Sequence, residues 1–405
     1  MSGRGRLTFG IGNWVRCRLT FRIENWVRCR TLLGARLGLI AVSLAVGIAC
    51  CESDMMSAQG EEAPKPKEIQ YTDLEGLVKE FSPQVQAERI QLDRHLGRYE
   101  RAREEMEETR RLLRAEAASM EKEGDGEGAE RCLAQAKTLE KAVKKIDQQI
   151  RSAKGSSGTM SLRQMEDTMT WTAQNLMGTY YTLNLEQEGA KAREELARSS
   201  YEKVQRQISV GGASPREAEE AEQAASEASR DVRALLDEKE RIKKDLAILL
   251  GYETGDEIEI LSMPAPDSAR IEGMNLKVDQ WKALGNNYEL RAQRGSSSAG
   301  SNKALHSRQR EMGQKEAELY ARIEALYQEV MAEHSAWKGA VTAMEGAEAG
   351  WKADSHKMEL GMLSDQEYLE ARAVYLEAVA AKGQADVKFQ QAMEAYDWAV
   401  KGLVQ

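Results

Sequence analysis

The sequence predicts an all-α protein: a two-repeat bundle of very long antiparallel, coiled-coil-like helices with little or no β-strand. Charged residues make up 30% of the 405 residues and aromatic residues only 6%, a composition typical of long helices rather than of a thick core. The six prolines leave residues 84–214 and 267–405 without a helix breaker. A Gly-to-Ser-x-x-Glu segment also occurs twice, 150 residues apart.

These two segments predict the tips of two helical hairpins. Residues 210–218 read Val-Gly-Gly-Ala-Ser-Pro-Arg-Glu-Ala, and residues 360–368 read Leu-Gly-Met-Leu-Ser-Asp-Gln-Glu-Tyr. A glycine easily takes the left-handed conformation that ends a helix. Ser-x-x-Glu forms a capping box that begins the next helix, and Pro215 suits its first position.

Residues 1–50 differ in composition from the rest of the chain. Residues 6–17 and 18–29 form a tandem basic repeat with interleaved aromatic residues. Such a repeat is compatible with contact to nucleic acid or lipid, and equally with a start codon assigned too far upstream. Residues 1–50 hold eight arginines and one acid, a net charge of +7, so their removal takes the chain from −9 to −16. A chain this acidic repels phosphates, which argues against nucleic-acid binding.

Residues 37–49 form an uncharged apolar run that ends at Cys50. The run is too short for a typical transmembrane helix and has the size and flanks of a signal-peptide core. We therefore expect export. Cys50 resembles a bacterial lipid-attachment cysteine, although Gly47 replaces the usual leucine, so lipidation at Cys50 and plain signal cleavage both stay open. Cys132 is the one cysteine after Cys51, which gives no internal disulfide framework.

The remaining chain divides into a tether and two helical repeats. We expect a polar tether over residues 51–67 and repeats over residues 68–262 and 263–405. The first repeat predicts helices over about 72–123, 129–154, 161–209 and 214–250, with glycine-rich breaks at 124–128 and 155–158. Its third helix shows a narrow coiled-coil seam, formed by Met165, Met169, Thr172, Leu176, Tyr180 and Leu183.

The second repeat follows the same plan. Residues 257–261 alternate briefly and suit either a short strand or an extended connector. A short helix over about 277–294 meets a glycine- and serine-rich segment at 295–301. A long helix then descends to Leu360, and a return helix runs from Ser364 to about Val400.

The repeat resembles that of the TolC-type outer-membrane efflux protein family. In that family the repeat opens with Asn-Pro-Glu-Leu, which residues 287–290 match except at the proline, and the first copy supplies this proline as Pro83. The hairpin tips match the family pattern from Tyr201 to Glu217 and from Trp351 to Glu367. The repeat end appears as Leu-Leu-Gly at residues 249–251.

The resemblance implies a partner for the tips and a role in transport. Family members form trimers whose tips meet a periplasmic or membrane-fusion adaptor and an ABC-type or other exporter. By resemblance, the tip residues that dock the adaptor are Val210, Gly211, Gly212, Ala213, Ser214, Leu360, Gly361, Met362, Leu363 and Ser364. The expected location is the cell envelope, in the outer membrane or periplasm, with a lipid anchor possible at Cys50.

The sequence departs from the family where membrane-spanning strands are expected. At the two corresponding positions stand residues 155–158 and 295–301. Neither holds the nine to eleven residues of apolar alternation that such a strand needs. The sequence therefore predicts a divergent relative without these strands.

Two functions stay open at this point. The first is a TolC-like component of an efflux or type I secretion assembly. The second is a lipid-anchored or secreted coiled-coil scaffold of the envelope with no transport role.

Nothing in the sequence indicates an enzyme, a cofactor or a metal site, because His95, His306, His334 and His356 are scattered singly. Residues 123–128 lack the ligand spacing of a calcium loop and predict a solvated turn.

Overall fold

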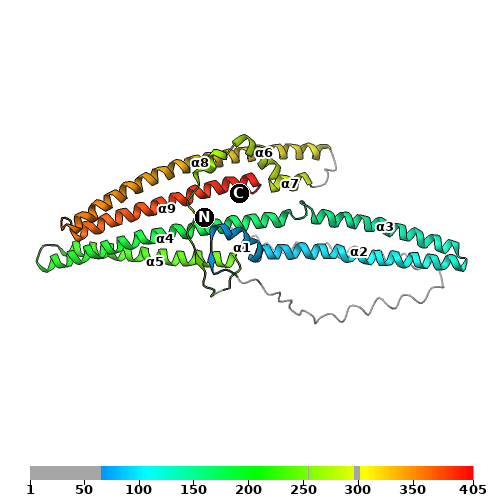
Figure 1. Ribbon diagram of the computed structural model, residues 1–405, viewed down its shortest axis with the longest axis horizontal. Helices are drawn as coiled ribbons and strands as arrows, with labels where there is room; N and C mark the ends of the chain where they lie inside the picture. The colour runs from blue at the N-terminus through cyan, green and yellow to red at the C-terminus, as the bar shows by residue number, and fades with distance from the viewer. Residues whose placement is uncertain (1–64, 254, 296–301, 405) are drawn as a thin grey trace, which may run out of the picture. The chain divides into compact units, whose positions relative to one another are not determined.

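The computed structural model describes residues 65–253, 255–295 and 302–404. These residues are almost entirely helical, and the long helices pack in antiparallel pairs (Figure 1). This confirms the predicted fold class. The basic repeat, the apolar run and Cys50 lie outside the described residues.

The first half begins with β1 (Glu68–Ile69), a 3₁₀ turn (Tyr71–Asp73) and α1 (Leu74–Phe81). Four long helices follow. Their bounds are α2 (Pro83–Glu123), α3 (Gly126–Lys154), α4 (Met160–Ser209) and α5 (Pro215–Leu249).

The second half repeats this order without a counterpart of α3. It begins with β2 (Glu259–Ile260) and a 3₁₀ turn (Ser268–Gly273), and continues through short helices into two long ones. Their bounds are α6 (Leu276–Asn286), α7 (Tyr288–Gly295), α8 (Asn302–Glu359) and α9 (Asp365–Lys401). β1 and β2 pair in parallel, so the short-strand alternative for residues 257–261 holds at 259–260.

The prediction of single helices over 72–123 and 277–294 was wrong, because each is broken in two. Ser82 lies between α1 and α2 with extended backbone, since a proline pushes the residue before it out of the helical region. In the second repeat Asn287 makes the same break without a proline. Its side-chain oxygen accepts a hydrogen bond from the Leu290 N–H at 2.9 Å and caps α7.

In each repeat, a glycine just after the last helix packs against the break between the first two helices. Gly251 follows α5 with φ +75°, and a Cβ there would lie 2.3 Å from the Phe81 carbonyl oxygen. Gly402 ends α9 with φ +116°, and a Cβ there would lie 2.4 Å from the Asn286 carbonyl oxygen. Both the left-handed backbone and the contact with backbone require glycine. The same closure in both halves shows that the duplication includes the tertiary contacts.

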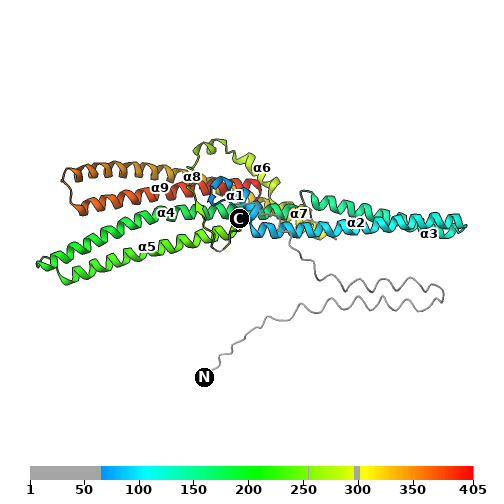
Figure 2. The same ribbon diagram turned by 60° about the horizontal axis from the view of Figure 1, so that its bottom comes forward.

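Helices α8, α9, α4 and α5 form one layer in that order. Contacts join α8 to α9, α9 to α4 and α4 to α5, and the two views agree on this order (Figure 1, Figure 2). Because α4 packs against both α9 and α5, a wider strip of its surface is buried than the narrow seam that the sequence predicts. The seam residues Met165, Met169 and Leu176 are only half-buried, whereas Ala173 and Met177 are fully buried.

α2 and α3 form a separate antiparallel hairpin, turning at Gly124 and Asp125. A turn lies within the predicted segment 123–128, but only Gly124 and Asp125 are outside the helices, so α3 begins three residues earlier than expected. The Asp125 carboxylate caps α3 by accepting the Gly128 N–H at 2.9 Å. Cys132 is buried in the small cluster that this hairpin encloses with Ala117. In the second half, α7 is followed directly in the element order by the long helix α8. The α2–α3 hairpin therefore has no counterpart among the described residues of the second half.

We expect Gly251→Ala to destabilise the protein more than Gly211→Ala does. The two glycines have matched φ angles of +75° and +74°, but open space surrounds Gly211. The left-handed conformation costs an alanine about 1–2 kcal/mol at either site, and the backbone overlap at Gly251 adds about 1–3 kcal/mol. Urea unfolding followed by circular dichroism measures the difference. Equal midpoints for the two variants would contradict the proposed closure.

Candidate functional site

The first tip (residues 210–214) joins α4 to α5 through the expected caps. Gly211 has φ +74°, and the N–H of Gly212 donates to the Gln207 carbonyl at 2.8 Å. Ser214 begins α5 with a complete capping box. Its hydroxyl accepts the Glu217 N–H at 3.3 Å, while the Glu217 carboxylate accepts the Ser214 N–H at 2.6 Å.

The second tip (residues 360–364) has the same construction between α8 and α9. Gly361 has φ +68°, and the N–H of Met362 donates to the Lys357 carbonyl at 2.9 Å. Ser364 and Glu367 complete a second capping box, with the Ser364 N–H 2.9 Å from the carboxylate. Both capping boxes read from the sequence are therefore present.

The tips expose apolar side chains beyond the ends of their helices. Val210 is 82% exposed, Leu360 60% and Met362 73%. Ala213 and Leu363, at equivalent positions of the two tips, are half-buried. Large apolar side chains this accessible at the end of a rigid hairpin are suited to insertion into a partner's surface.

Contacts between α4 and α9 bring the two tips to the same end of the layer. Near the tips, the Lys203 ammonium donates to the Gln366 side-chain oxygen at 2.6 Å, and the Gln366 amide lies 3.3 Å from the Ser200 hydroxyl. Further along, Arg372 pairs with Glu195 at 2.7 Å. From the first to the last of these pairs, the residue number falls along α4 and rises along α9. This is the regular register of two antiparallel helices.

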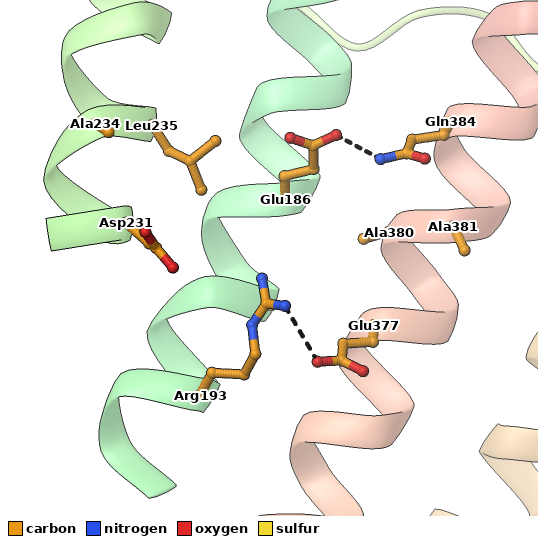
Figure 3. A pocket seen from close by; sticks show the side chains of 10 residues that line it. Glu186, Arg193, Asp231, Ala234, Leu235, Glu377, Ala380, Ala381 and Gln384 are labelled. Carbon is orange, nitrogen blue, oxygen red and sulfur yellow. Dashed lines mark hydrogen bonds and ion pairs between the residues drawn. The ribbon is translucent and has the colours of Figure 1, made fainter. Parts of the chain in front are cut away.

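The same interface borders a shallow groove of about 520 Å³ among α4, α5 and α9. Figure 3 shows two polar links across its α4–α9 side, one between Gln384 and Glu186 and one between Arg193 and Glu377. Arg193 and Glu377 are 3.5 Å apart. Such half-exposed pairs contribute little to stability, and we interpret them as fixing the register of α4 on α9.

Small residues allow α4 and α9 to approach closely. A Cβ at Gly178 would lie 3.0 Å from a methyl of Val387, and one at Gly189 would lie 3.9 Å from the Leu376 backbone. On α9, a Cβ at Gly383 would overlap the Leu185 side chain. We did not predict this interface. The sequence signal for this interface is the presence of glycines inside helices, where glycine is destabilising. This signal does not identify the interface, because Gly346 and Gly350 on α8 share it and have open space around them.

The four histidines lie apart, as expected from their scattered positions. His95 contacts Tyr99, and His306 is exposed. His334 stacks on Phe389 with ring centroids 5.2 Å apart, and His356 lies 3.4 Å from Glu359. Within the described residues no group of three or more acidic, histidine or cysteine side chains is placed to hold a metal ion.

The structure is similar to solved outer-membrane channels at low sequence identity. CusC is 13% identical with a TM-score of 0.44, over 77% of this chain and 96% of the channel. The Campylobacter jejuni channel CmeC is 12% identical with a TM-score of 0.42, over 65% of this chain and 68% of the channel. VceC of Vibrio cholerae is 11% identical with a TM-score of 0.39, over 66% of this chain and 76% of the channel.

No protein-family model matches the sequence, and no curated protein sequence matches it. Within the part of the chain that the structure describes, no helix has both the length and the apolar character to cross a membrane.

The capping hydrogen bonds lower the pKa of both tip glutamates. For Glu217 the main cause is the backbone N–H of Ser214, followed by the serine hydroxyl. For Glu367 the hydroxyl of Ser364 contributes most, followed by the backbone N–H. Because the folded pKa lies below the unfolded one, this stabilisation is fully present above the unfolded pKa. It is lost as the pH falls through the folded pKa.

Carboxyl titration by NMR tests this assignment. We expect Ser214→Ala to raise the titration midpoint of Glu217 toward the ordinary value, because it removes the hydroxyl donor and loosens the first turn of α5. Ser226→Ala, a serine-to-alanine change further along the same helix, serves as the control. An unchanged Glu217 midpoint in Ser214→Ala would show that the capping box is not formed in solution.

Proposed function

We propose that the protein is an exported, TolC-like helical component of an efflux or type I secretion assembly, and that its two tips dock an adaptor. The observation that carries the proposal is the pair of like-built tips at one end of the layer. Each is rigidly capped, and each presents large apolar side chains to solvent. Two protruding tips with the same geometry suit a partner that has repeated, equivalent binding sites.

The sequence motifs supply the identity of that partner. The matches to the family repeat, around Pro83 and Asn287 and at both tips, favour a periplasmic or membrane-fusion adaptor working with an ABC-type or other exporter. In this proposal residues 68–262 and 263–405 are two copies of the family repeat. The chain self-associates, as a trimer if it follows the family, and lies in the cell envelope with Cys50 as a possible lipid anchor.

Capture from the host cell tests the docking role. We expect the full-length protein to retain a membrane-fusion adaptor or transporter subunit, identified by mass spectrometry after mild cross-linking. The triple variant Val210→Asp, Leu360→Asp and Met362→Asp removes the exposed apolar side chains of the tips and keeps the residues of both capping boxes. We expect it to retain roughly tenfold less adaptor, because a few buried apolar contacts are lost. Val374→Asp changes a side chain that is 61% exposed on α9 outside the tip, and it should bind normally.

Equal capture of the adaptor by the triple variant and by Val374→Asp would refute docking through the tips. A deletion strain separates transport from the scaffold alternative. Greater susceptibility to at least one transported toxic solute, restored by the wild type and not by the triple variant, supports the proposal. Unchanged susceptibility across a broad panel together with altered envelope shape supports the scaffold.

A further inference from the structure

The α2–α3 hairpin has two chemically different sides on α3. Ala129, Cys132, Ala136 and Val143 are buried at three-, four- and seven-residue spacings and face α2. With 3.6 residues per turn, residues two positions from Val143 lie on the opposite side of the helix. Lys141 and Lys145 occupy these positions, and both are exposed.

The carboxylates in the second half of α3 are turned toward α2 and are paired there. Asp147 accepts a hydrogen bond from Arg103 at 2.5 Å. Glu140 bonds both Arg114 of α2, at 3.2 Å, and Lys144, at 3.0 Å. These pairings leave no carboxylate on the outward side of α3 between residues 133 and 152.

Exposed cations lie on that outward side and on the flank of α3 that Lys144 and Arg151 occupy, and together we call them the α3 basic face: Lys137, Lys141, Lys144, Lys145 and Arg151. All five side chains are exposed. Among the described residues only Lys144 of this set has an ion-pair partner. The face is therefore a concentrated positive charge on a chain whose formal net charge is −9.

The residue composition of the α3 basic face indicates which kind of partner binds it. Protein–protein interfaces are enriched in aromatic side chains and depleted in lysine, whereas this face is rich in lysine and has no aromatic residue. A band of cations along about 20 Å of one helix suits a flat array of negative charges. Polybasic segments are attracted to anionic lipid headgroups in this way.

We propose that the α3 basic face docks the α2–α3 hairpin onto the surface of a membrane rich in anionic phospholipid. The contact is peripheral: the ammonium and guanidinium groups meet headgroup phosphates, and the helix stays outside the hydrocarbon. Where the expected lipid anchor at Cys50 is present, the hairpin would be a second, electrostatic attachment point. This attachment is independent of what the tips bind.

Lysine footprinting on the full-length chain tests the proposal at single residues. The protein is acetylated with and without vesicles of phosphatidylcholine containing phosphatidylglycerol, and with vesicles of phosphatidylcholine alone. We expect the anionic vesicles to slow modification of Lys137, Lys141 and Lys145 by roughly threefold, and the neutral vesicles to have no effect. Exposed Lys338 on α8 is the internal reference, and the first lysine of the chain is Lys65, so the basic N-terminus adds no signal.

Charge reversal provides the matched variants. Lys141→Glu with Lys145→Glu should abolish the protection of Lys137, whereas Lys338→Glu should leave it intact. Loss of protection at about 0.5 M salt would further support an electrostatic contact. The proposal is overturned if neutral vesicles protect equally, if Lys338 is protected as strongly as Lys137, or if polyglutamate protects the face while anionic vesicles do not.

Discussion

The packing of α4 against α9 is the contact on which the rest of the structure depends. α4–α5 and α8–α9 are two hairpins from opposite halves of the chain, and this interface joins them into one layer. Gly178 and Gly383 permit the close approach, and Gly189 lies at ordinary contact distance from the Leu376 backbone. Polar pairs such as Arg372 with Glu195 fix the register. Because the register is regular up to Lys203 and Gln366, both tips lie at the same end of the layer.

At the opposite end of each repeat, close backbone contacts add to the packing of a buried apolar cluster. Gly251 and Gly402 each bring a helix end against the break between two helices of the same repeat. The parallel pairing of β1 with β2 then links the start of the first repeat to the segment just before the second. Tips and closures lie at opposite ends of long rigid helices, so a partner bound at the tips would act on a preorganised surface.

Much of this architecture could be read from the sequence, because its signals are local. The capping boxes at Ser214 and Ser364 depend on residues three positions apart, and both were predicted correctly. The breaks at Ser82 and Asn287 were both missed. Pro83 marks the first in the sequence, whereas the asparagine cap at the second carries a weaker signal than a proline. The α4–α9 interface was missed for a different reason. Gly189 and Gly346 look alike in sequence, and only the tertiary contacts distinguish the packed glycine from the open one.

The distance between the tips tests the central claim most directly. Spin labels at the exposed tip residues Val210→Cys and Leu360→Cys, with the native cysteines replaced by alanine, report this distance by pulsed electron paramagnetic resonance. We expect one narrow distribution that Gly346→Leu leaves unchanged and Gly189→Leu lengthens or broadens, because a leucine side chain would press on the Leu376 backbone. A broad distribution without either substitution, or one that Gly189→Leu does not alter, would contradict the claim that this interface positions the tips.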